Sequence, residues 1–149
     1  MGPGSRGSAT RPAAGRSAGG IAGLVLLALY GLTVAPDVTF WDAGEFATAF
    51  ATLGIPHPPG TPLFVALGRV WTLALGAVGV DPALAANLFS AACTVGAGAI
   101  TAALLARWTR ATGAGVAAAL CAGSTATVWL SATETEVYAA ALLLIWLAL

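Results

Sequence analysis

Apolar residues in this chain fall into four long runs that are separated by short polar segments. The runs cover residues 20–36, 82–106, 114–130 and 137–149. A helix that crosses a bilayer needs roughly 20 mostly apolar residues, so we interpret each run as a membrane span, the last one truncated. The pattern therefore predicts an all-α, polytopic transmembrane protein. Because the last run has no stop signal, we expect the chain to be the N-terminal piece of a longer one.

The segment between the first two runs follows a different pattern. Residues 37–54 are amphipathic when they are read at 3.6 residues per turn. Phe46 and Phe50 fall on the apolar face, and such a helix suits the membrane interface better than the bilayer core. The sequence "IPHPPG" then ends the helix, since its prolines lack amide donors. Residues 61–80 begin a new helix with a proline at its first helical position.

Charge placement indicates whether residues 61–80 cross the membrane. If these residues lie along the interface, all acids fall on one side, and every arginine except Arg69 falls on the other side. The positive-inside rule favours this arrangement, and a lipid-facing Arg69 at mid-bilayer would cost at least ~2.5 kcal/mol. We therefore predict one long external loop over residues 37–81 that carries interfacial helices, and a cytoplasmic N-terminus. The arginines on the cytoplasmic side are then Arg6, Arg11, Arg16, Arg107 and Arg110.

Composition agrees with an integral protein of the cell membrane. Hydrophobic residues make up 58% of the chain and charged residues only 8%, whereas soluble domains are nearer a quarter charged. Residues 1–19 are rich in Gly and Ser and carry three arginines, which predicts a disordered basic cytoplasmic tail. The net charge is zero and no basic face or nucleic-acid motif is present, so nucleic acid is not an expected partner.

Two acids stand out in the amphipathic segment. Asp42 and Glu45 are three residues apart and share a helix face. Two carboxylates at this spacing could supply a general base, or bind a cation or the hydroxyl groups of a sugar. The same spacing at a helix start is also typical of a capping box, in which Asp42 caps and Glu45 reaches back. On spacing alone the capping box is favoured.

Further candidates surround these acids in the predicted topology. His57 lies between prolines and could orient or donate to a phosphate, or it could be an ordinary loop histidine. Arg69 needs an anion or a carbonyl near the membrane, and the alternatives are the two acids, a lipid phosphate, or snorkelling to the head groups. Glu136 lies at the outer end of the third span beside Tyr138. Asn87, in the second span, is interpreted as an interhelical hydrogen-bonding residue.

The stretch "FWDAGEFATAFATLGIPHPPGTPLFVALGRVW" resembles the signature of a bacterial family of polytopic membrane proteins, to which a human transmembrane protein O-mannosyltransferase belongs. The pattern consists of an Asp-x-Gly-Glu helix, a "LGIPHPPG" turn and a "LGR" helix. The sequence "TEVY", at residues 135–138, resembles the second block of the family. The layout is more distantly similar to GT-C glycosyltransferases, in which an acidic motif and then a His-Pro-Pro turn occupy the first external loop.

The resemblance implies a GT-C-like fold and an inverting membrane glycosyltransferase. Such an enzyme moves a sugar, here a mannose-like hexose, from a polyprenyl-phosphate carrier to an acceptor hydroxyl on the external face. Asp42 matches the catalytic acidic position, and Glu45 is the neighbouring acid of the motif. His57 matches the histidine of the turn, and Glu136 takes the place of the acid in the second external loop. Tyr138 is grouped with the substrate-binding residues.

The resemblance also implies partners. These are the lipid-linked sugar donor, an acceptor that is a protein or a glycan, and membrane lipids. Arg69 would stabilise the leaving phosphate. A divalent cation is an open option as cofactor, and no residue is assigned to a metal. This chain by itself is expected to be inactive. Two alternatives stay open: a transporter or flippase of a lipid-linked or small polar substrate, and a structural protein in which the acids only cap a helix.

Overall fold

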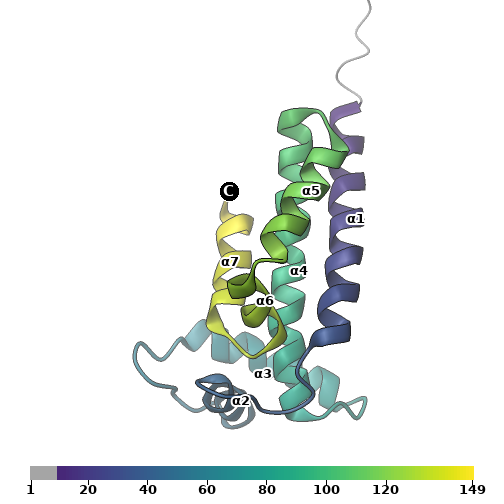
Figure 1. Ribbon diagram of the computed structural model, residues 1–149. Coiled ribbons are helices and arrows are strands. Elements are labelled where there is room, and N and C mark those ends of the chain that lie inside the picture. The colour runs from purple at the N-terminus through teal and green to yellow at the C-terminus, as the bar shows by residue number, and fades with distance from the viewer. Residues whose placement is uncertain (1–9) are drawn as a thin grey trace, which may run out of the picture.

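The computed structural model describes residues 10–149, which form seven helices and no strand. This confirms the all-α class that the apolar runs predicted. Figure 1 shows α1 and α4 side by side along their length, with α5, α6 and α7 packed against α4. The helices are α1 (Thr10–Thr33), α2 (Ala43–Thr52), α3 (Pro62–Gly76), α4 (Pro82–Thr109), α5 (Thr112–Gly123), α6 (Ala126–Thr133) and α7 (Val137–Ala148).

Two of these helices are long and apolar enough to cross a membrane. They are α1, through its residues Ala13–Thr33, and α4 over its whole length. The pair formed by α5 and α6 reaches the required length only if both helices are counted as one broken span, and α7 is shorter still. The described chain is therefore a polytopic membrane protein with two or three candidate spans.

Helix α1 begins inside the segment for which the sequence predicted a disordered tail. That prediction is wrong for residues 10–19, whereas residues 1–9 lie outside the described part of the chain. Small residues let α1 approach its neighbours: Ala18 is fully buried, and a Cβ at Gly19 would lie 3.0 Å from a backbone oxygen of α4. Close packing through small side chains is typical of membrane helices, and it outweighs the low helix propensity of Gly and Ser.

The predicted third span, residues 114–130, is not one helix. Helix α5 ends at Gly123, α6 begins at Ala126, and the two helices are bent by 74°. Between them Thr125 is extended, and its hydroxyl donates to the Ala122 carbonyl over 2.8 Å. A threonine that bonds its own backbone in this way competes with helix continuation. The sequence missed this break because the segment is uniformly apolar on either side of it.

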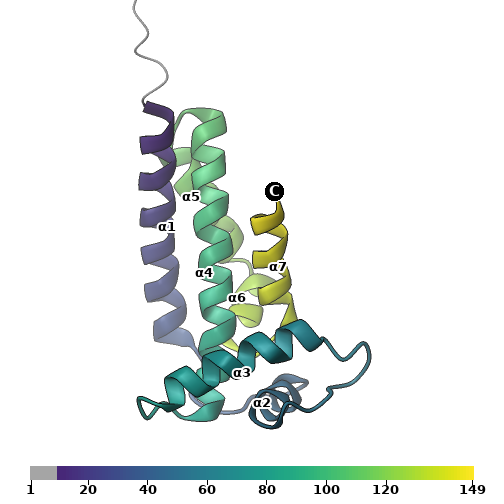
Figure 2. The same cartoon turned by 180° about the vertical axis from the view of Figure 1, so that it is seen from behind.

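Helices α2 and α3 lie across one end of the bundle. Figure 2 shows α3 crossing α4 at a steep angle near the base of the bundle, with α2 beside it. Helix α3 has Pro62 in its first turn, as predicted, and Asp81 caps α4 by accepting from the amide of Ala83 over 2.8 Å. Helix α2 begins at Ala43, later than the pattern indicated, because Trp41 has a φ of 63° that a right-handed helix excludes.

The charges are separated along the bundle. Arg107 packs beside Gly15, so the end of α4 and the start of α1 lie together at one end. The opposite end holds α2, α3 and the loops that join α6 to α7 and α1 to α2. These loops and helix starts carry all six acids of the chain: Asp37, Asp42, Glu45, Asp81, Glu134 and Glu136.

An aromatic cluster fixes the crosswise helices to the bundle. Phe46 and Phe50 of α2 are buried, and both contact Phe64 of α3, with ring centroids 5.2 and 4.9 Å apart. Phe89 of α4 joins the cluster at 5.7 Å from Phe50. Gly68 of α3 allows the Phe50 ring to pack directly against the backbone of α3, since any Cβ at residue 68 would overlap that ring. The buried cluster sets the position of α2, on which the candidate acids lie.

We expect Gly68→Ala to destabilise the protein by about 1–3 kcal/mol, because the added methyl group forces Phe50 out of its rotamer. The thermal unfolding midpoint in detergent measures this effect. Gly76→Ala is the matched control in the same helix, since nothing lies within 4 Å of a Cβ there. Equal midpoints for the two variants would contradict the packing that we describe for α2 and α3.

Candidate functional site

The loop that follows α2 folds back over the start of that helix and places His57 on Glu45. The backbone amide of His57 donates to Glu45 Oε1 over 2.6 Å, and the ring Nδ1 lies 2.7 Å from Glu45 Oε2. Both oxygens of one carboxylate are thus used by one residue, twelve positions further along the chain. The ring of Phe46 lies next to the imidazole, with ring centroids 5.7 Å apart. This double contact holds the proline-rich turn against α2.

The capping-box alternative is wrong for this pair of acids. Asp42 occupies the N-cap position of α2, but its side chain makes no capping hydrogen bond. Glu45 does not reach back to Asp42, because both of its oxygens bond His57. The Asp42 side chain is about half exposed, and its Oδ2 lies 3.8 Å from His57 Nε2. Asp42 is therefore an open carboxylate beside an oriented imidazole.

Electrostatics link the three groups. The hydrogen bonds from His57 hold the pKa of Glu45 below its ordinary value of 4.5, and the bond to Glu45 raises the pKa of His57 above 6.5. The charge of Asp42 also raises the pKa of His57, by a smaller amount. With Glu45 ionised, Nδ1 carries the proton that it donates, so Nε2 faces Asp42. The site therefore favours a charged or readily charged imidazole between two carboxylates.

The pH range of this pair follows from those directions. A raised pKa means that the stabilisation from His57 is fully present below pH 6.5 and is lost as pH rises through the raised value. A lowered pKa means that the stabilisation from Glu45 is present above pH 4.5 and is lost as pH falls through the lowered value. The contact between turn and helix is thus strongest from about pH 4.5 to 6.5, and it persists somewhat beyond both limits.

We expect an NMR titration of His57, the only histidine in the chain, to give a pKa above 6.5. Glu45→Gln should lower that pKa, because the ring loses its charged hydrogen-bond partner. Glu134→Gln is the matched control, since Glu134 is not among the groups that shift His57. An unchanged His57 pKa in the Glu45 variant would show that the contact does not form in the membrane.

The loop between α6 and α7 brings a third carboxylate to the site. Burial raises the pKa of Glu136, and the nearby charges of Asp42 and Glu134 raise it further. Glu134 accepts a hydrogen bond from the hydroxyl of Thr39 over 3.0 Å, so the two loops are joined. Tyr138 is 69% exposed at the start of α7. The structure thus gathers Asp42, Glu45, His57 and Glu136 at one end of the bundle.

Asn87 holds loops in position, whereas the sequence predicted only hydrogen bonds between helices for it. Its side chain is 2% exposed, and its amide nitrogen donates to the carbonyls of Ala35 and Asp37 over 2.9 and 3.0 Å. Its amide oxygen accepts from the buried Thr135 hydroxyl over 2.6 Å. One turn on, the Ser90 hydroxyl accepts from the Glu136 amide over 3.0 Å. Helix α4 therefore holds both loops that carry the acids. A buried asparagine near the start of an apolar run was the available signal.

Arg69 does not join the acids. Its guanidinium donates to the carbonyl of Ala51 over 2.7 Å and to that of Phe50 over 3.4 Å, at the C-terminal end of α2. Of the alternatives that the sequence left open, the structure therefore forms the contact with carbonyls, and the pairing with Asp42 or Glu45 is wrong. Those carbonyls lie roughly 13 Å along the helix from Asp42. A cation at a helix C-terminus stabilises the helix dipole.

The three contacting residues could also hold a metal ion. Asp42, Glu45 and His57 each offer one ligand atom, and these atoms lie within 4.8 Å of one another. Carboxylates with one imidazole suit a divalent cation. However, each Glu45 oxygen already accepts a hydrogen bond from His57, and His57 Nδ1 is engaged in one of these bonds. This geometry fits an acid–base pair better than a metal centre.

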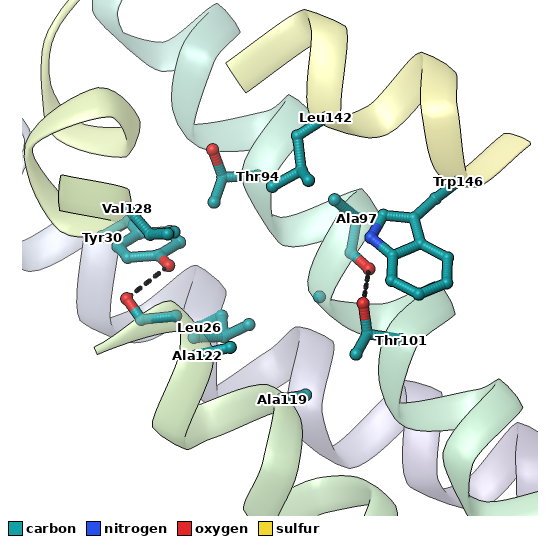
Figure 3. A pocket seen from close by; sticks show the side chains of 12 residues that line it. Leu26, Tyr30, Thr94, Ala97, Thr101, Ala119, Ala122, Val128, Leu142 and Trp146 are labelled. Carbon is teal, nitrogen blue, oxygen red and sulfur yellow. Dashed lines mark hydrogen bonds between the residues drawn. The ribbon is translucent and has the colours of Figure 1, made fainter. Parts of the chain in front are cut away.

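A separate apolar cavity of ≈ 230 Å³ lies within the bundle. Figure 3 shows it between α1, α4, α5 and α7, with Leu142 and Trp146 on one wall and Leu26 on the other. The Tyr30 hydroxyl donates to the Gly123 carbonyl over 2.9 Å. No charged side chain lines the cavity, so it offers no site for acid–base chemistry.

Comparison with known proteins shows to which family the chain is similar. Residues 42–149 match the family described as the protein O-mannosyl-transferase TMEM260 N-terminal domain. A protein O-mannosyl-transferase tmem260 of Dictyostelium discoideum is 41% identical over 44 residues, which is 30% of this chain and 5% of that protein. The chain thus spans only a small part of this relative. No solved structure matches the chain.

Proposed function

This chain belongs to the family of the protein O-mannosyl-transferase TMEM260 N-terminal domain, and on that premise we propose that it carries the base of a membrane mannosyltransferase. The observation that carries the proposal is the pairing of His57 with Glu45, which leaves Asp42 open beside an oriented imidazole. A capping role for these acids would need contacts that α2 does not make.

In the proposed reaction, the Asp42 carboxylate takes the proton of an acceptor hydroxyl. The acceptor oxygen forms a bond to the anomeric carbon of the sugar, and the bond from that carbon to the carrier phosphate breaks. The phosphate leaves with the electron pair, and attack from the opposite face inverts the configuration. A positioned base contributes typically 10²–10⁴-fold to such a step. We propose a polyprenyl phosphate as the carrier and a protein or glycan as the acceptor.

The crosswise position of α2 supports this proposal. A lipid-linked sugar presents its reactive carbon at the level of the head groups. The helix that carries Asp42 and Glu45 lies across the end of the bundle rather than along it (Figure 2). A base at that level can reach the sugar without entering the apolar interior. The transporter alternative has less support, since the cavity inside the described bundle has no charged lining.

The test is a transfer assay with the complete protein in proteoliposomes. We expect transfer of labelled mannose to an acceptor from polyprenyl-phosphate mannose, and no transfer from a nucleotide-linked mannose. Movement of the intact lipid-linked sugar across the bilayer without transfer would replace this proposal with the flippase alternative. Transfer from the nucleotide donor alone would contradict the proposed carrier.

Sidedness is tested by cysteine labelling of intact cells with a membrane-impermeant reagent. After Cys93 and Cys121 are replaced, Val78→Cys probes the end with the acids and Gly113→Cys probes the opposite end. Both positions are exposed. Because arginines gather near Gly113, we expect labelling at residue 78 only. Labelling at residue 113 alone would place the acids in the cytoplasm and contradict an external site.

A further inference from the structure

A groove lined in part by two carboxylates, the polar groove, adjoins the loop of Asp42 and is separate from the contact between Glu45 and His57. Its volume is ≈ 320 Å³, at the lower end of the range typical of small-ligand pockets, roughly 300–1,000 Å³. Two exposed aromatic residues and two carboxylates are among the residues that line it. The lining residues are Trp41, Thr127, Leu130, Ser131, Glu134, Glu136 and Tyr138.

Trp41 is the most unusual residue of this groove. Its side chain is 92% exposed, so the described chain gains almost no burial from a large apolar ring. Its backbone has a φ of 63°, a left-handed conformation that is strained for a bulky residue. Such outliers concentrate at ligand-binding sites, where the surrounding structure imposes them. Trp41 also directly precedes Asp42, so a ligand on the indole lies next to the proposed base.

The loop that carries the two carboxylates is held in place. Glu134 is fixed by the hydroxyl of Thr39, and that bond uses only its Oε2, which leaves Oε1 for a ligand. Glu136 is fixed through its backbone amide by Ser90, so its side chain is free of that contact. A groove lined by two carboxylates and two exposed aromatic rings matches a ligand with many hydroxyl groups and an apolar face. A pyranose ring has both properties.

We propose that the groove between Trp41, Tyr138, Glu134 and Glu136 binds the hexopyranose ring of a glycosyl substrate. The aromatic rings cover the C–H face of the sugar, and the two carboxylates accept hydrogen bonds from its hydroxyl groups. This assignment rests on the proposed transferase function, and it names the sugar subsite of that enzyme. The base at Asp42 and the sugar subsite are then neighbours along one loop.

The groove continues into the bundle, which points to the sugar of the donor. Thr127, Ser131 and Tyr138 line both the polar groove and a second, apolar groove of ≈ 330 Å³. That second groove runs over Ala139 and Leu142 of α7 toward the membrane-embedded part of the bundle. A ligand with a sugar head and a hydrocarbon chain fits both parts, whereas an acceptor glycan fits only the polar part.

Binding is tested without turnover by saturation-transfer NMR with methyl α-mannoside and the complete protein in nanodiscs. We expect Trp41→Ala to weaken binding about tenfold, the size of one aromatic contact. Trp108→Ala is the matched control, since Trp108 is also exposed but lies at the opposite end of α4. Because Trp41 is exposed, its loss leaves the packing intact. Equal affinity of the wild-type protein and the Trp41 variant would overturn the proposal.

A second variant and a kinetic measurement separate the two sources of the sugar. Glu134→Gln keeps the shape of the groove and should also weaken mannoside binding. In the transfer assay, we expect both variants to raise KM for the lipid-linked donor about tenfold and to leave KM for the acceptor within twofold. A rise in KM for the acceptor alone would overturn the assignment to the donor sugar.

Failure of this proposal is distinguishable from failure of the proposed function. If the wild-type protein transfers mannose and the Trp41 variant keeps both KM values, the groove assignment fails and the transferase stands. If the protein binds mannoside through Trp41 but transfers nothing, the groove stands as a sugar site and the transferase assignment fails.

Discussion

Asp42→Asn is expected to lower mannosyl transfer by about 10²–10⁴-fold, because the amide cannot take the proton of the acceptor hydroxyl. The substitution keeps the shape of the side chain, and α2 does not depend on it, since Asp42 makes no capping hydrogen bond. Expression and the thermal unfolding midpoint should therefore stay at their wild-type values. The measurement is the initial rate of transfer in proteoliposomes at saturating donor.

Asp37→Asn is the matched control for this variant. Asp37 lies in the same loop, and its carboxylate bonds only the neighbouring amide of Val38, over 2.7 Å. We expect its transfer rate to stay within about twofold of the wild-type rate, the usual outcome away from a reacting group. Wild-type transfer in the Asp42 variant would remove Asp42 from the mechanism and return the acids to a structural role.

Asn87→Leu is expected to lower transfer by about 10²-fold, although Asn87 lies outside the groups that react. The leucine leaves the carbonyls of Ala35 and Asp37 and the hydroxyl of Thr135 without partners, each at a cost of about 1–3 kcal/mol. The loops that carry Asp42 and Glu136 then lose their common anchor. A displacement of about 1 Å at a reacting group is enough for a loss of this size.

The rate constant and the unfolding midpoint together test the role of Asn87. Thr94→Val is the matched control, since Thr94 is also buried in α4 but bonds only the Ser90 carbonyl of its own helix. We expect that variant to keep its activity. A positioning role predicts that kcat falls far more in the Asn87 variant than in the Thr94 variant. Loss of kcat in both variants equally would instead mean that α4 tolerates no substitution.

The sequence by itself determined the class of the protein and the identity of its candidate acids. Long apolar runs require helices, because only internal hydrogen bonds satisfy a backbone in lipid. Proline starts α3 where the pattern placed it, since its fixed φ and missing amide suit a first turn. Asp42, Glu45 and His57 stand out because polar residues are scarce in this chain.

Only the tertiary structure decided how those residues are used. The spacing of Asp42 and Glu45 favoured a capping box. The turn after α2 instead places His57 where it hydrogen-bonds Glu45. Glu136 joins the site because Asn87 and Ser90 of α4 bond the loop that carries it. These residues are more than forty positions away from that loop in the sequence. Residues 10–19 are helical because α1 packs against its neighbours there. The segment 114–130 forms two helices that are bent relative to each other. Local propensities differ by less than about 1 kcal/mol per residue, so close contacts between distant segments outweigh them.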